Sequence, residues 1–190
     1  DKSFCAWTFR KAEGFFDIVT WTGNGVSGRE IPHNLGSVPG MILVKNLSLA
    51  ADWRVFHRSL GPTKNVLLNG TNAPLTQSGM WNDTAPTSTV FTVGNDGGVN
   101  SNTSTYNYVA YVFAHNAQDF GENSDQAVVY CDSFDTSSFG TSGLEVNVGF
   151  EIQWLLYKRT DTTGDWYIMD IMRGAYPPFE GNYGQVIKVN

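Results

Sequence analysis

Short apolar runs separated by glycine, proline and asparagine occur along the whole chain, and they predict strands rather than helices. Residues 15–22 alternate, with Phe16, Ile18 and Thr20 on one face. Residues 41–45 are apolar up to the terminal Lys45, which is typical of a strand buried on both faces. The expected strands cover residues 3–11, 15–22, 29–33, 41–45, 53–58, 65–69, 87–93, 106–115, 127–133, 144–148, 154–158, 166–172 and 185–189.

One stretch of the chain recurs. Residues 35–60 and residues 146–174 run in step without a gap when Met41 is laid on Trp154. Each copy has an apolar run that ends in lysine, a short polar connection, and an Asp-Trp pair that opens a second apolar run. The matched residues are Lys45 with Lys158, Asp52 with Asp165, Trp53 with Trp166, and Gly61 with Gly174. Self-similarity at a fixed spacing indicates a repeated structural unit.

The pattern therefore predicts an all-β protein with two related β-sandwich (jelly-roll-like) modules that arose by internal duplication. Residues 1–122 form the first module and residues 123–190 form a second module that is incomplete, because no counterpart of 106–115 follows it. The segment FCAWTF at 4–9 resembles YVAYVF at 108–113. Residues 1–12 are thus expected to supply the closing strand of the second module or of a preceding one.

The amino-acid composition indicates a protein with an aromatic core and without nucleic-acid-binding or membrane-spanning segments. The 190 residues include 6 Trp, 8 Tyr and 12 Phe, which is enough aromatic surface to build a core without disulfides. The net charge is −6 and no run of lysine or arginine occurs, so we expect no nucleic-acid partner. No apolar run reaches the length of a membrane span. Two cysteines, Cys5 and Cys131, are interpreted as buried thiols, with one long-range disulfide as the alternative.

The chain begins at Asp1 and carries no signal peptide. Together with the incomplete second copy, this start predicts that a segment was removed or that the sequence is part of a longer chain.

Five strings in order resemble a known family. They are TGNG at 22–25, HNLGSVPGMILVKN at 33–46, WNDT at 81–84, VFTVG at 90–94 and YVAYVFAH at 108–115. Together they resemble a repeated β domain of unknown function that occurs in tail-fibre and other virion-appendage proteins of marine bacteriophages. The resemblance implies a structural role in the virion, a homotrimer that contacts other virion proteins, and no catalytic residues. The second copy lacks the WNDT and VFTVG strings.

No residue set points to a metal or a cofactor. His33, His57 and His115 are far apart and have no ligand spacing, so we interpret them as strand-end or surface residues. Residues 95–98, NDGG, could offer oxygen ligands to Ca²⁺ but lack the alternating acidic pattern of a calcium loop, and a plain turn is favoured. The glycine-rich stretch 23–28 precedes no helix, which argues against a phosphate-binding loop.

A polysaccharide-degrading enzyme is the natural catalytic alternative, and it requires two carboxylates across a cleft. The candidates are Glu30, Asp52, Asp83, Asp165 and Asp170. Asp52 and Asp165 hold the same position in both copies, so a role in turns, through bonds to local backbone groups, explains them better.

Tryptophans are the remaining candidates for ligand contact, because their rings can stack on sugars. Trp53 and Trp166 open apolar strands and are interpreted as core residues. Trp81 lies in the polar stretch 70–84, which is expected to be a long loop, so the candidate contact residues are Trp81, Asn82 and Asp83.

The sequence thus favours a virion structural protein, namely a tail-fibre or receptor-binding appendage that binds a host-surface glycan and is not an enzyme. A capsid decoration or head-fibre protein is the first alternative, and a polysaccharide-degrading enzyme is the second.

Overall fold

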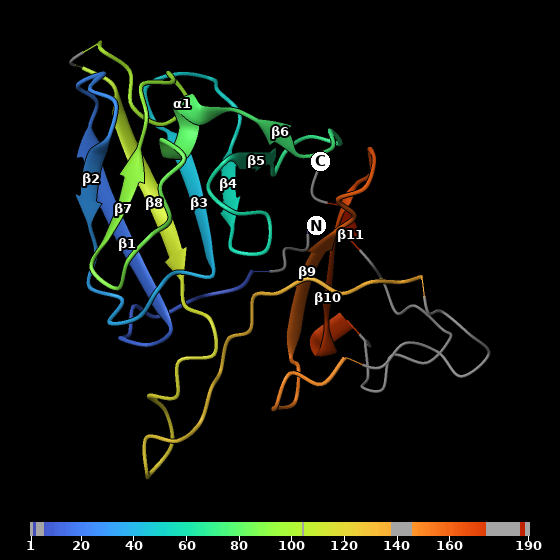
Figure 1. Cartoon of the computed structure of the whole chain (residues 1–190). Coiled ribbons are helices and arrows are strands. Elements are labelled where there is room, and N and C mark those ends of the chain that lie inside the picture. The colour runs from blue at the N-terminus through green and yellow to red at the C-terminus, as the bar shows by residue number, and fades with distance from the viewer. Residues whose placement is uncertain (1, 3–5, 104, 138–145, 174–186, 189–190) are drawn as a thin grey trace.

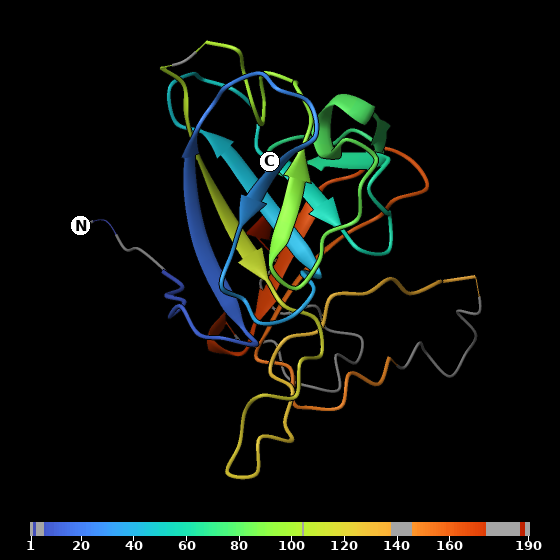
Figure 2. The ribbon, with the colours of Figure 1, turned by 60° about the vertical axis from the view of Figure 1, so that its left-hand side comes forward.

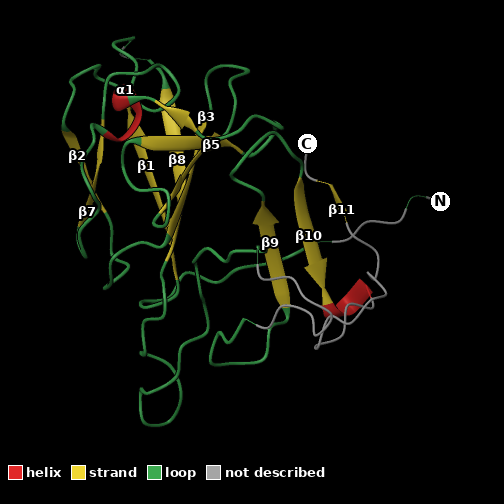
Figure 3. Ribbon diagram, turned by 45° about the vertical axis from the view of Figure 1, so that its right-hand side comes forward, coloured by secondary structure: helices red, strands yellow, loops and turns green. Residues whose placement is uncertain are grey.

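The computed structural model consists almost entirely of β-strands and loops, as Figure 3 shows. It describes residues 2, 6–103, 105–137, 146–173 and 187–188. The expected all-β class is therefore confirmed. In the described part of the chain, helix is limited to the single turn α1 (Ser78–Trp81) and the 3₁₀ turn η1 (Ile171–Arg173).

A six-stranded sheet forms the centre of the molecule (Figure 1). Its neighbouring strands are antiparallel, and β8 lies between β1 and β3 although β3 precedes it by more than 60 residues. In spatial order the strands are β1 (Phe16–Thr22), β8 (Asn107–Phe113), β3 (Met41–Asn46), β4 (Arg54–His57), β5 (Lys64–Leu67) and β6 (Leu75–Thr76).

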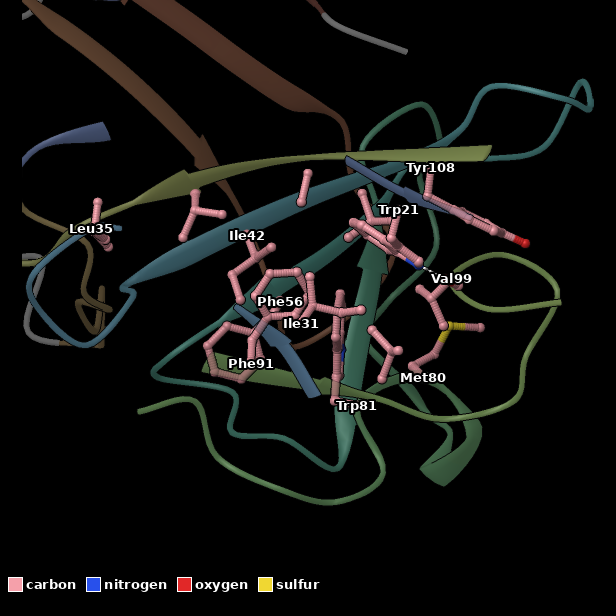
Figure 4. Close-up of a cluster of buried hydrophobic side chains, with 14 of the residues drawn as sticks. Trp21, Ile31, Leu35, Ile42, Phe56, Met80, Trp81, Phe91, Val99 and Tyr108 are labelled. Carbon is pink, nitrogen blue, oxygen red and sulfur yellow. Dashed lines mark hydrogen bonds between the residues drawn. The ribbon is translucent and has the colours of Figure 1, made fainter. Parts of the chain in front are cut away.

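A small second sheet covers one face of this layer and makes a sandwich with it (Figures 1 and 2). It pairs β2 (Arg29–Pro32) with β7 (Val90–Val93), and α1 lies beside it. The first core fills the space between the two layers (Figure 4). Its largest side chains that are completely shielded from solvent are Trp81, Tyr108, Phe91, Leu35, Ile42 and Met80.

The opposite face of the six-stranded sheet is also covered, which explains the unbroken apolar run in β3. Ile42 and Val44 point into the first core, whereas Met41 and Leu43 belong to a second core. Each aliphatic residue buried in this way stabilises the fold by about 1.5–3 kcal/mol. The prediction that residues 41–45 form a strand buried on both faces is confirmed.

A third sheet supplies the far side of the second core. It contains β11 (Ile187–Lys188), β10 (Trp166–Asp170) and β9 (Trp154–Lys158) in that order. Trp166 belongs to the second core together with Val55 and Phe113 of the central sheet, and Leu156 packs against this core. The indole N–H of Trp166 donates to the carbonyl of Leu67 at 2.8 Å, which joins the two sheets directly.

The two copies of the repeat adopt the same strand pairing. The β3–β4 and β9–β10 hairpins are both antiparallel and have equivalent rungs under the alignment of Met41 with Trp154. β5 and β11 pair with matched residues of β4 and β10, although β11 lies further along the chain than the gap-free alignment would place the counterpart of β5. The equivalent rungs are Met41–His57 with Trp154–Asp170, Val44–Arg54 with Tyr157–Tyr167, and Val55–Val66 with Ile168–Ile187.

The polar contacts of the repeat are equivalent too. The ammonium of Lys45 donates to the carbonyl of Ala51 and lies 6.0 Å from the ring centroid of Trp53. Lys158 donates in the same way to Gly164 and lies 6.0 Å from Trp166. The lysine and tryptophan that both copies share thus hold the hairpin connection in the same way in each copy.

Four sequence-based expectations about elements are wrong. Residues 6–11 form no strand, because Phe9 inserts its ring into the second core and Trp7 donates to the carboxylate of Asp170 at 3.1 Å. Residues 127–133 form no strand either. The expected loop at 70–84 contains β6 and α1. Residues 146–148 of the expected strand 144–148 form no strand either, and residues 144 and 145 lie outside the described residues, as do 185, 186 and 189 of the expected strand 185–189.

None of the helices in the described part of the chain is long and apolar enough to cross a membrane.

Candidate functional site

One end of the sandwich gathers four connections, which we call the loop end. It comprises residues 22–28, 46–49 and 82–83 and, in the fourth connection, residues 95–103 and 105–107, and it lies at the upper edge of Figure 1. Backbone bonds tie the connections together: Gly23 donates to Tyr106 at 2.8 Å and Leu47 donates to Asn107 at 2.7 Å. The four connections thus form one continuous surface rather than independent loops.

Asn100 holds two of these connections from inside. Its side chain is fully buried, and its amide donates to the carbonyls of Val26 at 2.9 Å and Gly94 at 3.0 Å. Its carbonyl oxygen accepts the backbone N–H of Asn24 at 2.9 Å. A buried amide whose donors and acceptor are all used gives the loop a single conformation.

Asn46 and Tyr108 do the same for the other connections. The amide of Asn46 donates to Gly97, and its oxygen accepts the backbone N–H groups of Ser48 and Leu49. The Tyr108 hydroxyl donates to Gly97 at 2.9 Å. Burial raises the pKa of Tyr108 above its ordinary value, so the phenol remains a donor.

The loop end exposes both apolar and polar groups to solvent. Val26, Leu47 and Leu49 are 57%, 59% and 47% exposed, and Asn24 and Asn102 are exposed as well. Pre-formed loops that present scattered apolar side chains among amides and hydroxyls suit a binding surface, because little conformational entropy is lost on contact.

The predicted contact residues are divided by the structure. Trp81 is only 1% exposed, so the expectation of an exposed indole is wrong. Its ring packs edge-on against Phe56 at 5.8 Å, and its N–H donates to the carbonyl of Lys64 at 3.1 Å (Figure 4). One helical turn at α1 directs this side chain inward, a turn too short to give a periodic signal in the sequence.

Within the loop end, Asp83 is exposed and Asn82 is half-buried. Both have left-handed backbone conformations, with φ of 52° and 49°, which asparagine and aspartate tolerate better than most residues. The Asn82 oxygen accepts the hydroxyl of Ser27 at 2.7 Å, which connects the turn after α1 to residues 22–28. Their contact with a ligand stays a prediction.

Residues 95–98 form a turn, as favoured from the sequence. Asp96 accepts the backbone N–H of Gly98 at 2.7 Å, and its own carbonyl accepts the N–H groups of Val99 and Asn100. Within the described residues, no group of three or more histidine, cysteine, aspartate or glutamate side chains is placed to hold a metal ion.

A second polar region lies at the opposite end of the sheet, and we call it the titratable cluster. It was not predicted from the sequence, because its members come from three distant segments: His57, Arg58, Ser59, His115, Tyr130, Cys131 and Asp132. It contains the residue types of a serine or cysteine hydrolase, whose activity depends on specific hydrogen bonds between the nucleophile, a histidine and a carboxylate.

The bonds within the cluster differ from those of a catalytic triad. The Ser59 hydroxyl donates to Asp132 at 2.8 Å instead of to a histidine. His57 and His115 each accept a backbone N–H at Nδ1, from Ser59 and Cys131 respectively, so neither presents Nδ1–H to a carboxylate. Burial raises the pKa of the Cys131 thiol to about 12, which keeps it protonated and a weak nucleophile.

The candidate carboxylates lie on different elements. Asp52 accepts the amide of Asn69 at 2.9 Å, and Asp170 is buried and accepts the indole of Trp7. Glu30 lies on β2, and Asp165 directly precedes β10. Asp52 therefore has a local structural role, as its place in the repeat suggested, although its partner is a side chain rather than backbone.

A known family model matches nearly the whole chain. Residues 9–185 match the model of a domain of unknown function, DUF7483. The chain belongs to the DUF7483 family. The match spans β1 to β10, the loop end and the titratable cluster, so these features lie within a single family unit. No curated protein and no solved structure matches this DUF7483 domain.

Proposed function

We propose that this DUF7483 domain is a structural protein of a marine bacteriophage virion, a tail-fibre or receptor-binding appendage that acts by binding rather than by catalysis. We further propose that it contains two related sandwich modules derived from one ancestral module by duplication. The matching registers of β3–β4–β5 and β9–β10–β11, with their equivalent lysine and tryptophan contacts, support the duplication.

The observation that carries an assembly role is the outer edge of β9. In the first copy, the equivalent edge of β3 is covered along six residues by β8. Among the described residues, β9 pairs with β10 alone. Its sequence, WLLYK, contains no proline and only one charge, at its end, and that ammonium is already bonded to Gly164. An apolar edge of this kind is a site for pairing with another chain.

Head-to-tail pairing of this edge with a different edge of the next copy forms a ring where the rotation between copies closes, and three-fold closure gives a trimer. The loop end then remains free to face a host-surface glycan, since it lies on the sandwich and away from β9 (Figure 1). In this proposal the edge holds the assembly together and the loop end makes the receptor contact.

The oligomeric state tests the first half of this proposal. We expect the purified chain to form trimers by light scattering and the Leu155→Lys variant to be monomeric, because a lysine on an edge strand opposes pairing. Ile18→Lys on β1, the outer strand of the central sheet, is the matched control and should leave the trimer intact. A wild-type chain that is monomeric at all accessible concentrations would contradict edge-mediated assembly.

Antibody labelling of intact particles, viewed by electron microscopy, tests location. Labels on the tail support the appendage, whereas labels across the head support a capsid decoration protein. Binding to host polysaccharide that is lost in Leu47→Asp, with no release of reducing ends, supports a receptor contact. Release of reducing ends would instead favour a polysaccharide-degrading enzyme.

A further inference from the structure

Residues 129–132, which we call the strap, join the two halves of the chain at the titratable cluster. Val129 packs against both cores, and Cys131 is only 7% exposed within the second core. The backbone N–H of Asn116 donates to the carbonyl of Val129 at 2.8 Å. The strap therefore covers the end of the central sheet where β8 finishes.

The central sheet is shaped to receive the strap at Gly40. A Cβ atom on Gly40 would lie 2.6 Å from the Cβ of Cys131 and 2.8 Å from the Cβ of His115. Contacts this short do not occur between real side chains, so the glycine allows the strap to approach the sheet. The approach is thus a specific docking contact.

A carboxylate fixes the end of the strap. Asp132 accepts from the guanidinium of Arg58 at 3.2 Å and from the hydroxyl of Ser59 at 2.8 Å. The Tyr130 hydroxyl also donates to Asp132, at 3.4 Å, and its ring lies 5.0 Å from that of His115. The charged anchor and both histidines thus occupy one small volume.

Two of the bonds in this volume require neutral imidazoles. The backbone N–H of Cys131 donates to Nδ1 of His115 at 3.1 Å, and the backbone N–H of Ser59 donates to Nδ1 of His57 at 3.3 Å. A protonated imidazole carries hydrogen on both nitrogens. Protonation therefore turns each acceptor into a donor that faces another donor.

We propose that the strap is an acid-sensitive latch, which holds the second half of the chain against the central sheet at neutral pH and releases it when His57 and His115 take up protons.

The cations that surround the histidines favour release, and the carboxylate of Asp132 opposes it. His57 and His115 both lie in the field of Arg58, and Asp132 is the carboxylate that acts on both. Protonation of both imidazoles places three cations around that single carboxylate. Burial opposes ionisation of Asp132, but bonds from Ser133, Ser59 and Arg58 hold its pKa below the ordinary value, so it remains charged at mildly acidic pH.

The direction of the pH effect follows from the histidines. Burial is the main reason that the pKa values of His57 and His115 lie below 6.5. His57 and His115 bind protons more readily when the strap is undocked or the chain is unfolded than when the strap is docked. Docking is therefore complete above pH 6.5 and weakens as the pH falls below it. The Cys131 thiol titrates far above this range, because burial raises its pKa to about 12.

Accessibility of Cys131 measures the latch directly. In a Cys5→Ser chain, Cys131 is the only thiol, since the sequence contains two cysteines. We would follow its reaction with 4,4′-dithiodipyridine at pH 7.5 and pH 5.0, relative to a small free thiol. We expect the relative rate to rise about tenfold at pH 5.0 while far-UV circular dichroism stays unchanged.

Asparagine at both histidine positions provides the matched control. Its side-chain oxygen can accept the same backbone N–H but does not titrate. The double variant His57→Asn/His115→Asn should therefore react slowly at both pH values. If the double variant does not fold, His115→Asn alone is the control, and it should remove most of the rise in rate at pH 5.0. Gly40→Ala should react rapidly even at pH 7.5, because its Cβ displaces the strap.

Three outcomes overturn the latch. The first is an equal relative rate at both pH values in the Cys5→Ser chain. The second is an acid-dependent rate that survives in the folded asparagine variants. The third is loss of the circular dichroism signal at pH 5.0 together with labelling, because the whole domain has then unfolded and no separate release occurs.

Discussion

Replacement of Trp81 by alanine distinguishes a core residue from a ligand contact at the position where sequence and structure disagree. The indole is 1% exposed and packs against Phe56, and its N–H is bonded to the carbonyl of Lys64. Removal of a fully buried tryptophan costs about 3–5 kcal/mol. The loss of the bond leaves the Lys64 carbonyl without this donor, which places the expected cost near the upper limit, at about 4–5 kcal/mol.

The measurement is urea unfolding followed by far-UV circular dichroism, because the fluorescence signal changes with the substitution itself. Trp81→Phe retains most of the ring but loses the N–H, and we expect it to cost about 2 kcal/mol. Trp53→Ala is a suitable comparison, since Trp53 is only half-buried, stacked on Tyr111 at 5.9 Å, and should cost clearly less.

A cost below about 1 kcal/mol for Trp81→Ala would refute the core assignment, because a buried ring cannot be removed so cheaply. The same conclusion would follow if Trp81→Ala abolished glycan binding while the midpoint of unfolding stayed at the wild-type value. A native protein has only about 5–15 kcal/mol of stability, so the expected loss is easily resolved.

Three further predictions concern single polar groups. Asn100→Ala should lower the unfolding free energy by about 2–3 kcal/mol and speed amide hydrogen exchange at Asn24, whose N–H loses its acceptor; unchanged exchange there would contradict the clamp. Asp17→Asn should cost about 2 kcal/mol at pH 7, since the buried carboxylate bonds Lys11 and the N–H groups of Ile18 and Asn34. Burial opposes ionisation of Asp17, yet these bonds together keep its pKa below 3.8. The stability advantage of the wild type should therefore shrink as the pH falls below 3.8 in urea titrations. Burial raises the pKa of the Cys131 thiol to about 12, so the thiol contributes stability that is fully present below pH 9 and is lost at about 1.4 kcal/mol per pH unit between pH 9 and pH 12. Cys131→Ala should remove this part of the slope of unfolding free energy against pH, and identical slopes in the two proteins would refute the prediction.

Local pattern predicted the strands whose side chains alternate or are uniformly apolar. β1, β3, β8, β9 and β10 all lie where the apolar runs placed them, because period-2 alternation and burial on two faces leave a direct trace in the chain. The N-terminal segment failed for the same physical reason. FCAWTF has the alternation of a strand, but residues 6–9 form no strand: Phe9 packs against the second core, and Trp7 donates to Asp170.

The fate of single side chains was less predictable. Trp81 lies among polar residues in the sequence, and only the one-turn helix α1 rotates it inward. The buried amides of Asn46 and Asn100 gave no signal, because an asparagine in a loop is ordinary until tertiary packing removes its water.

The sequence by itself determined that the chain is all-β and that residues 41–58 and 154–170 share one hairpin design. Both conclusions depend on spacing along the chain. Only the tertiary structure decided which side chains meet: that the second copy packs on the outer face of the first, that four connections form the loop end, and that His57, His115 and Asp132 converge. Those contacts join segments that are separated along the chain, such as His57 and Asp132, and nothing in local periodicity encodes the distance between them.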